Sequence, residues 1–576
     1  MKRIIYTAAL AALLTSCVQD LDTLPLDKTE PISEYVYGNS EEAYLAGLTR
    51  LYFQFVTNDL TDMQPMDGGA SELIRAFWSV QEATTDEAKC SWEKDAWVRA
   101  LNTNTWTGVQ NDAIYAVYVR TLQGVAFVNE YLRQTTPDKL ASRGVSADLA
   151  AKIQTFRAEA RFIRAYLYWI ALDCFGNVPF TTEDSPFGGT YFPSQAPRAQ
   201  IFDYCVGELQ ALLAEDSPMM EARALYPRAD KGSAAGLLAR MYLNAKVYTG
   251  VDMSMEAKDL CEDIFAMGYQ LCPSYADLFR GDNGQNASAR SEFLWAVDYD
   301  NNNINSYGGT TYILSASMAS TDITDSSRPN GQVNGWAGLR VPYEFVSKYF
   351  DVSGQDYTTG TYQVSDKRGE IFYIKGRSES MEGALYSFMN GWTCLKFNNI
   401  PSGETDQSYL PQSATMSNSN VDFPMIRLAE IYLIYAEVCM NLGVPDEALP
   451  YLQALAARAG LTASAPAASA LEVPATSARA ASAVEVPAAS ARAEVAPPSE
   501  ITPDFLLAER ARELLWEAHR RTDLIRFGLY HTADLLWPYK GGDSYAGAAF
   551  PAYRCIFPLP PTELATNTAL VQNPGY

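Results

Sequence analysis

The stretch from Lys152 to Phe180 constrains the fold of this chain more than any other. Its apolar residues recur at alternating steps of four and three, the pattern of one face of an α-helix. A second apolar row runs beside the first, so the later part of the helix is apolar nearly all round and belongs inside a bundle. Gly176 is expected to end the helix, and Pro179 to prevent its resumption. The first row contains Phe156, Ala160, Ile163, Leu167, Ile170 and Cys174, and the second contains Phe162, Tyr166 and Trp169.

A basic stripe lies on a third face of the same helix. It consists of Arg157, Arg161 and Arg164. A buried guanidinium is tolerated only beside acidic or hydrogen-bonding groups. We therefore expect the neighbouring helices to supply such partners.

Further helical stretches surround this one. They alternate with short Gly/Pro turns and have small residues at close contacts, as in tetratricopeptide-like helix pairs, although no strict repeat period is visible. The chain is thus predicted to be mostly α, with a helical-pair scaffold at about 41–271 and 421–576. The predicted helices cover 41–55, 71–79, 111–132, 198–214, 231–248, 254–267, 424–442, 446–459 and 502–527.

Two segments depart from the helical pattern. Residues 272–420 are rich in Asn, Gly, Ser and Tyr and contain short β-like pieces, so they are predicted to be a loop-rich, partly β excursion. Such a long excursion from a scaffold is more often functional than idle. Residues 462–500 are dominated by Ala, Ser and Pro with a thirteen-residue tandem, and are predicted to be a disordered surface insertion.

The first residues have the pattern of a bacterial lipoprotein signal. Lys2 and Arg3 precede a short apolar core, and Leu14-Thr15-Ser16-Cys17 looks like a lipobox. This pattern predicts a signal peptide at 1–16 and lipidation of the Cys17 sulfur, leaving 17–576 as a single tethered domain. An ordinary signal peptide with an incidental cysteine is the alternative. No other stretch is long and apolar enough to cross a bilayer.

Composition argues against several functions. The formal net charge is −24, whereas nucleic-acid binding needs a basic footprint. The eight cysteines after Cys17 show no CxxC spacing, so no zinc or redox site is indicated. The Asn-rich stretch 298–305 offers oxygen ligands for Ca²⁺ but lacks the EF-hand spacing, so a simple loop is favoured. Neither a metal nor any other cofactor is predicted.

Evidence for an enzyme is weak. Only His519 and His531 are present, and the Gly-x-Ser-x-Gly and phosphate-binding motifs are absent. A glycosidase needs only two carboxylates and remains an open alternative. Charged stripes lie on the helices near 157–164, 427–437 and 509–523, and carboxylates in the last two could suggest acid–base hydrolysis. We interpret all three stripes as a structural ion-pair network that fixes helix packing.

Four stretches spread over the chain resemble the SusD/RagB family of surface lipoproteins. They begin at Ala158, Phe423, Glu509 and Phe557, and the segments from Gly68 and Thr84 add the N-terminal pattern of that family. The resemblance implies a mostly helical fold and a lipid-anchored location at the cell surface on the outer membrane. It also implies capture of oligosaccharides and their delivery to a SusC-like TonB-dependent transporter. The insertion 462–500 departs from the family pattern, which puts its effect on docking in doubt.

Three other functions stay open beside this one. Some members of the family resemble peptide-uptake partners, so a RagB-type peptide-binding protein is the nearest alternative. A scaffold that binds only protein and a glycoside hydrolase are the others.

Candidate ligand contacts follow from the chemistry of sugar binding. Sugars stack on aromatic rings while planar polar groups take their hydroxyls. Residues 83–108 are predicted to be irregular and contain Trp92, Trp97 and Trp106 among polar residues, and the excursion adds Tyr299, Tyr307 and Trp336. Local loop packing is the competing interpretation for each. By family resemblance, Asp67, Arg75 and Trp92 occupy a segment that contributes glycan contacts, with Asp95 just beyond.

Overall fold

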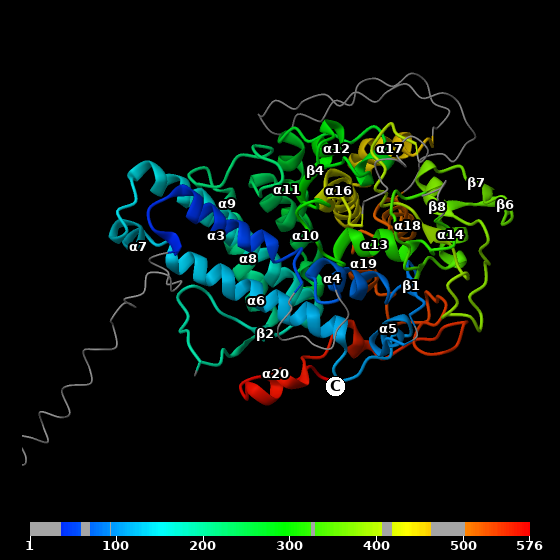
Figure 1. The fold of residues 1–576 in the computed structure, drawn as a ribbon, viewed down its shortest axis with the longest axis horizontal. Coiled ribbons are helices and arrows are strands. Elements are labelled where there is room, and N and C mark those ends of the chain that lie inside the picture. Colours follow the sequence, from blue (N-terminus) through cyan, green and yellow to red (C-terminus); the bar gives the residue numbers. More distant parts are fainter. Residues whose placement is uncertain are drawn as a thin grey trace, which may run out of the picture.

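The computed structural model describes residues 36–58, 69–92, 94–189, 191–323, 329–405, 417–461 and 501–576. The proposed signal peptide, Cys17, Asp67 and the insertion 462–500 lie outside these ranges. Long helices dominate and the strands are short, which confirms the predicted fold class (Figure 1). No helix within these ranges is both long and apolar enough to span a membrane.

The helices and strands have the following bounds. The α-helices are α3 (Glu41–Phe53), α4 (Leu73–Glu82), α5 (Ala96–Asn102), α6 (Asp112–Gln134), α7 (Pro137–Ser142), α8 (Ala147–Phe175), α9 (Arg198–Leu213), α10 (Lys231–Thr249), α11 (Ser254–Ala266), α12 (Ala287–Glu292), α13 (Gly309–Ser317), α14 (Tyr343–Phe350), α16 (Leu428–Asn441), α17 (Leu449–Arg458), α18 (Pro503–Glu513), α19 (Arg520–Arg526) and α20 (Pro561–Thr566). The strands are β1 (Lys89–Cys90), β2 (Val178–Pro179), β3 (Gln195–Ala196), β4 (Phe293–Val297), β5 (Leu339–Arg340), β6 (Ser353–Asp356), β7 (Thr361–Gln363), β8 (Phe372–Tyr373), β9 (Thr393–Cys394) and β10 (Phe423–Arg427).

Helix α8 is the central element, as its sequence predicts. The side chain of Ser146 caps its first turn by accepting a hydrogen bond from the backbone N–H of Leu149. Gly176 ends it with a φ of 70°, a backbone conformation that costs glycine little. Every residue from Phe162 to Phe175 is buried. The helix is therefore surrounded by protein along its later half.

The basic stripe of α8 finds the partners that burial requires. Arg157 donates to the backbone carbonyl oxygen of Leu132 at 2.6 Å. Arg161 and Arg164 both bind the carboxylate of Glu208 on α9, at 2.8 Å and 3.2 Å. The stripe thus ties α8 to its neighbours on both sides.

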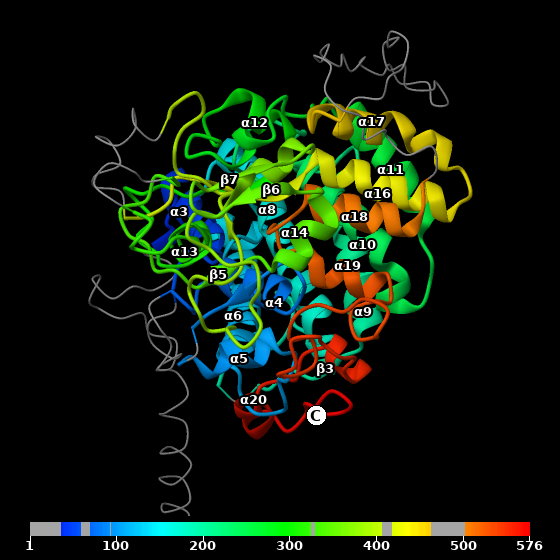
Figure 2. The ribbon, with the colours of Figure 1, turned by 90° about the vertical axis from the view of Figure 1, so that its right-hand side faces the viewer.

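Consecutive helices pack against one another through the scaffold. α8 contacts α6 and α9, and the series continues through α9–α10, α10–α11, α11–α16 and α16–α17. This is the predicted tetratricopeptide-like pairing. In Figure 2 the later helices α9–α11 and α16–α19 lie on the right, and the loop-rich part with α13, β5, β6 and β7 lies on the left. The strands form two-stranded antiparallel sheets, each too small to make a layer of its own.

The predicted continuous helix at 502–527 is wrong, because the structure divides it into α18 and α19. Trp516 and Ala518 between them have φ values of 63° and 64°, which no helix contains. Glu87 stabilises this break, since its carboxylate accepts the backbone N–H of Trp516 at 3.1 Å and its carbonyl oxygen accepts the indole N–H at 3.0 Å. The Trp516 ring also packs edge-on against Trp78 of α4, with centroids 5.2 Å apart. Tertiary contacts override the helical pattern here.

Two further boundaries differ from the sequence expectation. The predicted helix 424–442 begins as strand β10, because this segment pairs antiparallel with β4 before α16 starts. The segment 83–108, expected to be irregular, contains β1 and α5. Both strands obtain their pairing from distant parts of the chain, which a local pattern does not show.

A buried ion network joins the C-terminal helices to the excursion. Glu513 of α18 accepts from Arg368 at 2.9 Å, from Arg427 at 2.6 Å, and from Arg458. The side chain of every member of the network is at most 6% exposed, so the charges neutralise one another away from water. This confirms the interpretation of the charged helical stripes as structural. We define the buried ion network as Glu292, Asp366, Arg368, Lys396, Arg427, Arg458, Glu509, Glu513 and Glu517.

Because of this network, the free energy of unfolding is expected to fall at acidic pH. Burial by itself would raise the pKa of Glu509, but Arg368 and Arg512 hold it at about 2, below the ordinary 4.5. A depressed carboxyl pKa stabilises the fold above the unfolded value, and this stability is lost as pH falls from about 4.5 towards 2. The difference corresponds to about 3 kcal/mol. We expect the unfolding free energy, measured by urea denaturation at a series of pH values, to fall steeply in that window.

The variant Glu509→Gln tests this origin. It should lower the unfolding free energy at pH 7 by about 3 kcal/mol, because the buried guanidinium of Arg368 loses one of its three carboxylate partners. It should also make the fall in stability below pH 4.5 less steep. Glu221→Gln is the matched control, since Glu221 also pairs with a cation but its side chain is 80% exposed. If the unfolding free energies of the wild type and Glu509→Gln fell equally between pH 4.5 and 2, the acid dependence would not come from Glu509.

Candidate functional site

An aromatic pair on the surface of the excursion is the centre of the candidate site. Tyr307 lies between β4 and α13 and is 55% exposed, and Trp336 lies half-buried before β5. Their rings meet edge to face, with centroids 5.8 Å apart and planes at 73°. An exposed aromatic residue held by a second one is a fixed apolar surface on which a planar or ring-shaped ligand can stack.

Trp92 lies beside the chain segment that carries Trp336. Its indole N–H donates to the carbonyl oxygen of Ala337 at 2.9 Å, and its ring packs edge-on against Tyr312 of α13 at 5.8 Å. Gly338 has no room for a side chain, because a Cβ there would lie 2.4 Å from the Trp92 indole nitrogen. Trp92 therefore fixes the position of the Trp336 segment.

Arg75 contacts the segments that carry Trp92, Tyr307 and Tyr312. It is buried in α4, donates to the backbone carbonyl oxygen of Tyr307 at 3.2 Å, and lies over the rings of Tyr312 and Trp92 at 4.4 Å and 5.6 Å. These cation–π contacts and the hydrogen bond hold three distant parts of the chain together. The structure thus brings together predicted residues 75, 92, 307 and 336. We call Arg75, Trp92, Tyr307, Tyr312 and Trp336 the aromatic cluster.

Glu72 is a positioning residue that the sequence reasoning missed. It stands at the N-cap of α4, and its buried carboxylate accepts the backbone N–H groups of Arg75 at 2.6 Å and Gly309 at 2.9 Å. It also accepts the hydroxyl of Tyr299 at 2.5 Å. Burial raises the pKa of Glu72 to about 7 despite these donors. An acidic residue directly before an apolar helical run was the available signal.

Tyr299 therefore has a different role from the predicted one. It is only 3% exposed, and its hydroxyl is engaged by Glu72. The prediction that it faces a ligand is not supported. The residue instead fixes the loop that leads to Tyr307, because Glu72 holds both Tyr299 and the start of α13.

The Trp-rich segment divides into residues with different surroundings. Asp95 is half-buried at the N-cap of α5, and Trp97 is half-buried on α5 with its ring against the core. Trp106 is buried, and its indole N–H donates to the hydroxyl of Tyr576 at 2.9 Å. Burial of Trp106 follows from the C-terminal tail, so its polar sequence neighbours were misleading.

Metal-binding chemistry finds no support in the described ranges. No group of three His, Cys, Asp or Glu side chains there is placed to hold an ion. In the Asn-rich loop, Asp300 uses its carboxylate to accept the backbone N–H of Asn302 at 2.8 Å, as in a local turn. The cysteines from Cys90 to Cys555 are free thiols, and all but the last are buried.

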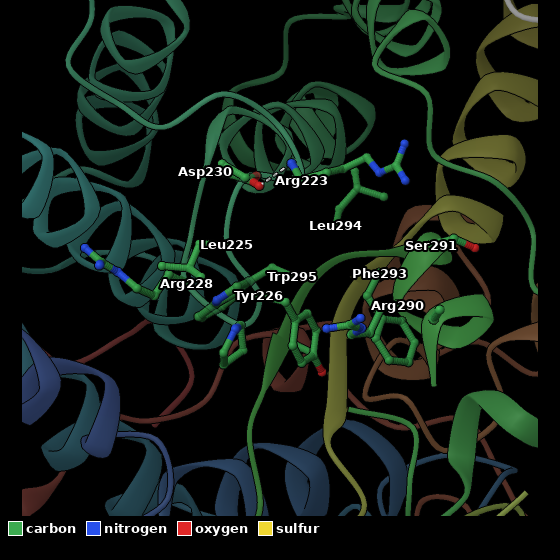
Figure 3. Close-up of a pocket in the computed structure, with 14 residues that line it drawn as sticks. Arg223, Leu225, Tyr226, Arg228, Asp230, Arg290, Ser291, Phe293, Leu294 and Trp295 are labelled. Atoms are coloured by element: carbon green, nitrogen blue, oxygen red, sulfur yellow. Dashed lines mark hydrogen bonds between the residues drawn. The ribbon is translucent and has the colours of Figure 1, made fainter. Parts of the chain in front are cut away.

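The aromatic cluster presents one exposed side chain, that of Tyr307, and two cavities lie apart from it. One cavity, of about 380 Å³, lies elsewhere, between the loop 223–230 and the α12–β4 segment (Figure 3). Another, of about 280 Å³, lies beside α6 and the loop 179–193. Neither contains a residue predicted from the sequence to bind ligand.

Comparison with known proteins identifies what the chain resembles. Residues 356–576 match the model of the SusD family. The starch-binding protein SusD of Bacteroides thetaiotaomicron is 28% identical, covering 99% of this chain and 98% of that protein. A SusD-like protein of Bacteroides ovatus is 23% identical, covering 77% of this chain and 72% of the relative. The resemblance to the SusD/RagB family seen in the sequence is confirmed.

Solved structures share the fold. A SusD superfamily protein from Parabacteroides distasonis is 20% identical with a TM-score of 0.63, covering 93% of this chain and 100% of that one. The surface glycan-binding protein A of Bacteroides thetaiotaomicron, solved with laminarihexaose, is 16% identical with a TM-score of 0.63, covering 92% and 99%. At these identities the likeness establishes the fold.

The two tyrosines of the site loop should respond differently to loss of their hydroxyls. Tyr299→Phe leaves the buried Glu72 carboxylate without one donor, so we expect it to lower the unfolding free energy by about 1 to 3 kcal/mol. Tyr307→Phe is the matched control and should change it by less than about 0.5 kcal/mol, because Tyr307 is exposed. Chemical denaturation measures both. Wild-type stability of Tyr299→Phe would show that Glu72 does not depend on this contact.

Proposed function

We propose, from the SusD fold and the SusD-family match of residues 356–576, that this protein is a glycan-binding lipoprotein of the cell surface. It captures oligosaccharides without cleaving them and delivers them to a SusC-like TonB-dependent transporter in the outer membrane. The similarity to a protein named for starch binding, and to one solved with a bound oligosaccharide, supports a glycan as the ligand class.

The exposed Tyr307–Trp336 pair is the observation that carries this proposal. A sugar presents apolar C–H faces that stack on such rings, and its hydroxyls bind planar polar groups nearby. Arg75 and Trp92 hold the pair in place from two other segments, so little conformational freedom is lost on binding. Binding at a single sugar is expected to be weak, and several contacts along one chain make capture effective.

Three other predicted contacts, Asp67, Asp95 and Trp97, remain proposals. Asp95 and Trp97 lie half-buried near the start of α5. Asp67 lies outside the described residues, four positions before Ser71 in the segment that leads to α4. We propose that these residues contact sugar units beyond the one that stacks on Tyr307.

A binding role also fits the surroundings of the buried scaffold carboxylates. Glu509 and Glu513 are fully engaged with arginines, so they have neither free oxygens nor an open cleft for acid–base hydrolysis. Among the described residues, Glu72 is the carboxylate that contacts the segments of the aromatic cluster. It is buried, and its contacts with Tyr299 and Gly309 fix the loop that carries Tyr307. We therefore propose that the captured sugar chain leaves unchanged.

Calorimetric titration of protein lacking residues 1–17 tests the proposal. The first ligands are α-1,4- and β-1,3-linked glucose oligosaccharides. These are the linkages of starch, which one relative is named for binding, and of laminarihexaose, with which a protein of similar fold was solved. We expect Tyr307→Ala and Trp336→Ala each to weaken binding about tenfold, which corresponds to about 1.4 kcal/mol of lost stacking and burial. Trp92→Ala should weaken binding too, with some loss of stability because its indole hydrogen bond to Ala337 disappears.

Phe187→Ala is the matched control, since Phe187 is 76% exposed but lies in a different loop. It should bind as the wild type does. Peptides titrated in parallel distinguish a peptide-uptake protein, and chromatography of the sugars afterwards detects cleavage. Heats with peptides alone, shortened sugar chains, or wild-type affinity in Tyr307→Ala and Trp336→Ala would each refute the proposal.

The anchor at Cys17 is proposed from the lipobox pattern alone. In cells, the wild type should incorporate labelled palmitate and sediment with outer membranes, and Cys17→Ala should do neither, because acyl chains hold by apolar burial. Purification of the anchored wild type tests the partner, with a TonB-dependent transporter expected in the eluate. Unlabelled wild type would contradict the anchor, and an eluate without a transporter would contradict the partner.

A further inference from the structure

The cavity between the loop 223–230 and the α12–β4 segment, apart from the aromatic cluster, has the chemistry of an anion-binding site. It measures about 380 Å³, within the range of about 300 to 1,000 Å³ usual for small-molecule sites. One wall is the loop 223–230 between α9 and α10, and the other is α12 with the first part of β4 (Figure 3). The lining residues that bear on the ligand are Arg223, Tyr226, Arg228, Asp230, Arg290 and Phe293.

The lining is cationic in a strongly acidic protein. Three arginines but only one carboxylate line the cavity, whereas the whole chain carries a net charge of −24. That carboxylate, Asp230, is 4% exposed and already accepts the backbone N–H groups of Arg223 at 2.6 Å and Ser233 at 3.0 Å. It caps α10 and has little left for the arginine side chains.

One of the three arginines is already neutralised. The guanidinium of Arg228 pairs with the buried carboxylate of Glu159, with one of the two contacts at 2.9 Å. Figure 3 shows Arg228 extending to the left, away from the guanidinium groups of Arg223 and Arg290. Arg228 therefore belongs to the scaffold, and the positive charge of the cavity comes from the other two.

Arg223 and Arg290 keep their charge uncompensated. Arg223 is exposed and donates one N–H to the carbonyl oxygen of Gly268 at 2.5 Å, which fixes the side chain without neutralising it. Arg290 is exposed beside the Tyr226 ring, 5.8 Å from its centroid. Within the ranges that the structure describes, neither guanidinium forms an ion pair. A planar guanidinium fork matches a carboxylate or sulfate group with two parallel hydrogen bonds.

Tyr226 gives the cavity a rigid apolar wall. Its hydroxyl donates to the carboxylate of Asp422 at 2.5 Å, and its ring stacks on Phe293 with planes at 27° and centroids 6.4 Å apart. A separate, smaller hollow of about 200 Å³ shares Pro227, Arg228 and Ala296 with this cavity, and its other lining residues are mostly apolar side chains of α3, with Asp298 as its one carboxylate. A ligand with one charged group and a less polar remainder fits this arrangement.

We propose that Arg223 and Arg290 form a second ligand site for an acidic sugar unit, bearing a carboxylate or a sulfate ester. The anionic preference follows from the cavity alone, and the choice of a sugar rests on the proposed function. The site would let the protein retain charged glycans in addition to those that stack on Tyr307. It shares no lining residue with the aromatic cluster.

Saturation-transfer NMR, with affinities from calorimetry, tests the site in protein lacking residues 1–17. The probes are methyl glucuronide, glucose 6-sulfate, uncharged methyl glucoside and inorganic sulfate. Tyr307→Ala/Trp336→Ala serves as the background, so that signals from the aromatic cluster are removed. We expect at least one acidic sugar to bind, methyl glucoside not to bind, and affinity to fall as ionic strength rises. The tighter of the two acidic sugars identifies the charged group.

Arginine variants in the same background locate the binding. Arg223→Gln and Arg290→Gln should each weaken acidic-sugar binding about tenfold, and the double variant should abolish it. Arg50→Gln is the matched control, because Arg50 is also exposed over an aromatic ring, 4.6 Å from the centroid of Phe127. It should bind as the background protein does, and circular dichroism should show every variant folded.

Three outcomes would overturn the proposal. Acidic sugars could fail to bind, could bind the double arginine variant unchanged, or could bind no better than inorganic sulfate, which would leave a simple ion site. These three outcomes concern acidic sugars only. Whether the Tyr307–Trp336 surface binds neutral oligosaccharides is measured separately on the wild type, so the two proposals can fail independently.

Discussion

The buried ion network around Glu513 is the interaction on which the rest of the structure depends. Three arginines, from the excursion, the end of β10 and the end of α17, converge on this one carboxylate. Charges without water are expensive unless each has a partner, so an alternative packing of these segments would leave some of them unpaired. The network therefore selects one arrangement of C-terminal helices against the excursion, whatever its net contribution to stability.

This arrangement also positions the candidate glycan site. The break between α18 and α19 presents Trp516, whose carbonyl oxygen accepts the indole N–H of Trp78 at 3.0 Å. Trp78 lies on α4, the helix that carries Arg75 and begins at Glu72. A continuous path of buried contacts thus runs from the ion network to the loop of Tyr307. The site residues come from loops, but a rigid scaffold determines where they lie.

Local patterns predicted the long helices well and the breaks badly. The period of α8, its stop at Gly176 and its need for partners to Arg161 and Arg164 were all visible in the sequence, because each depends on neighbours a few residues away. The break at Trp516 was not visible, since Glu87 and Trp78 stabilise it from more than four hundred positions away. For the same reason the strand nature of β10 depends on β4.

The sequence by itself determined the fold class, the family resemblance and the aromatic residue types on which a sugar can stack. Tertiary structure alone decided which of them are available. Trp106 is buried because the C-terminal Tyr576 takes its indole N–H, Tyr299 is buried because Glu72 takes its hydroxyl, and Tyr307 remains exposed. Exposure depends on partners that only folding brings close. The positive charge of the cavity does too, because Glu159 pairs with Arg228 and not with Arg223 or Arg290.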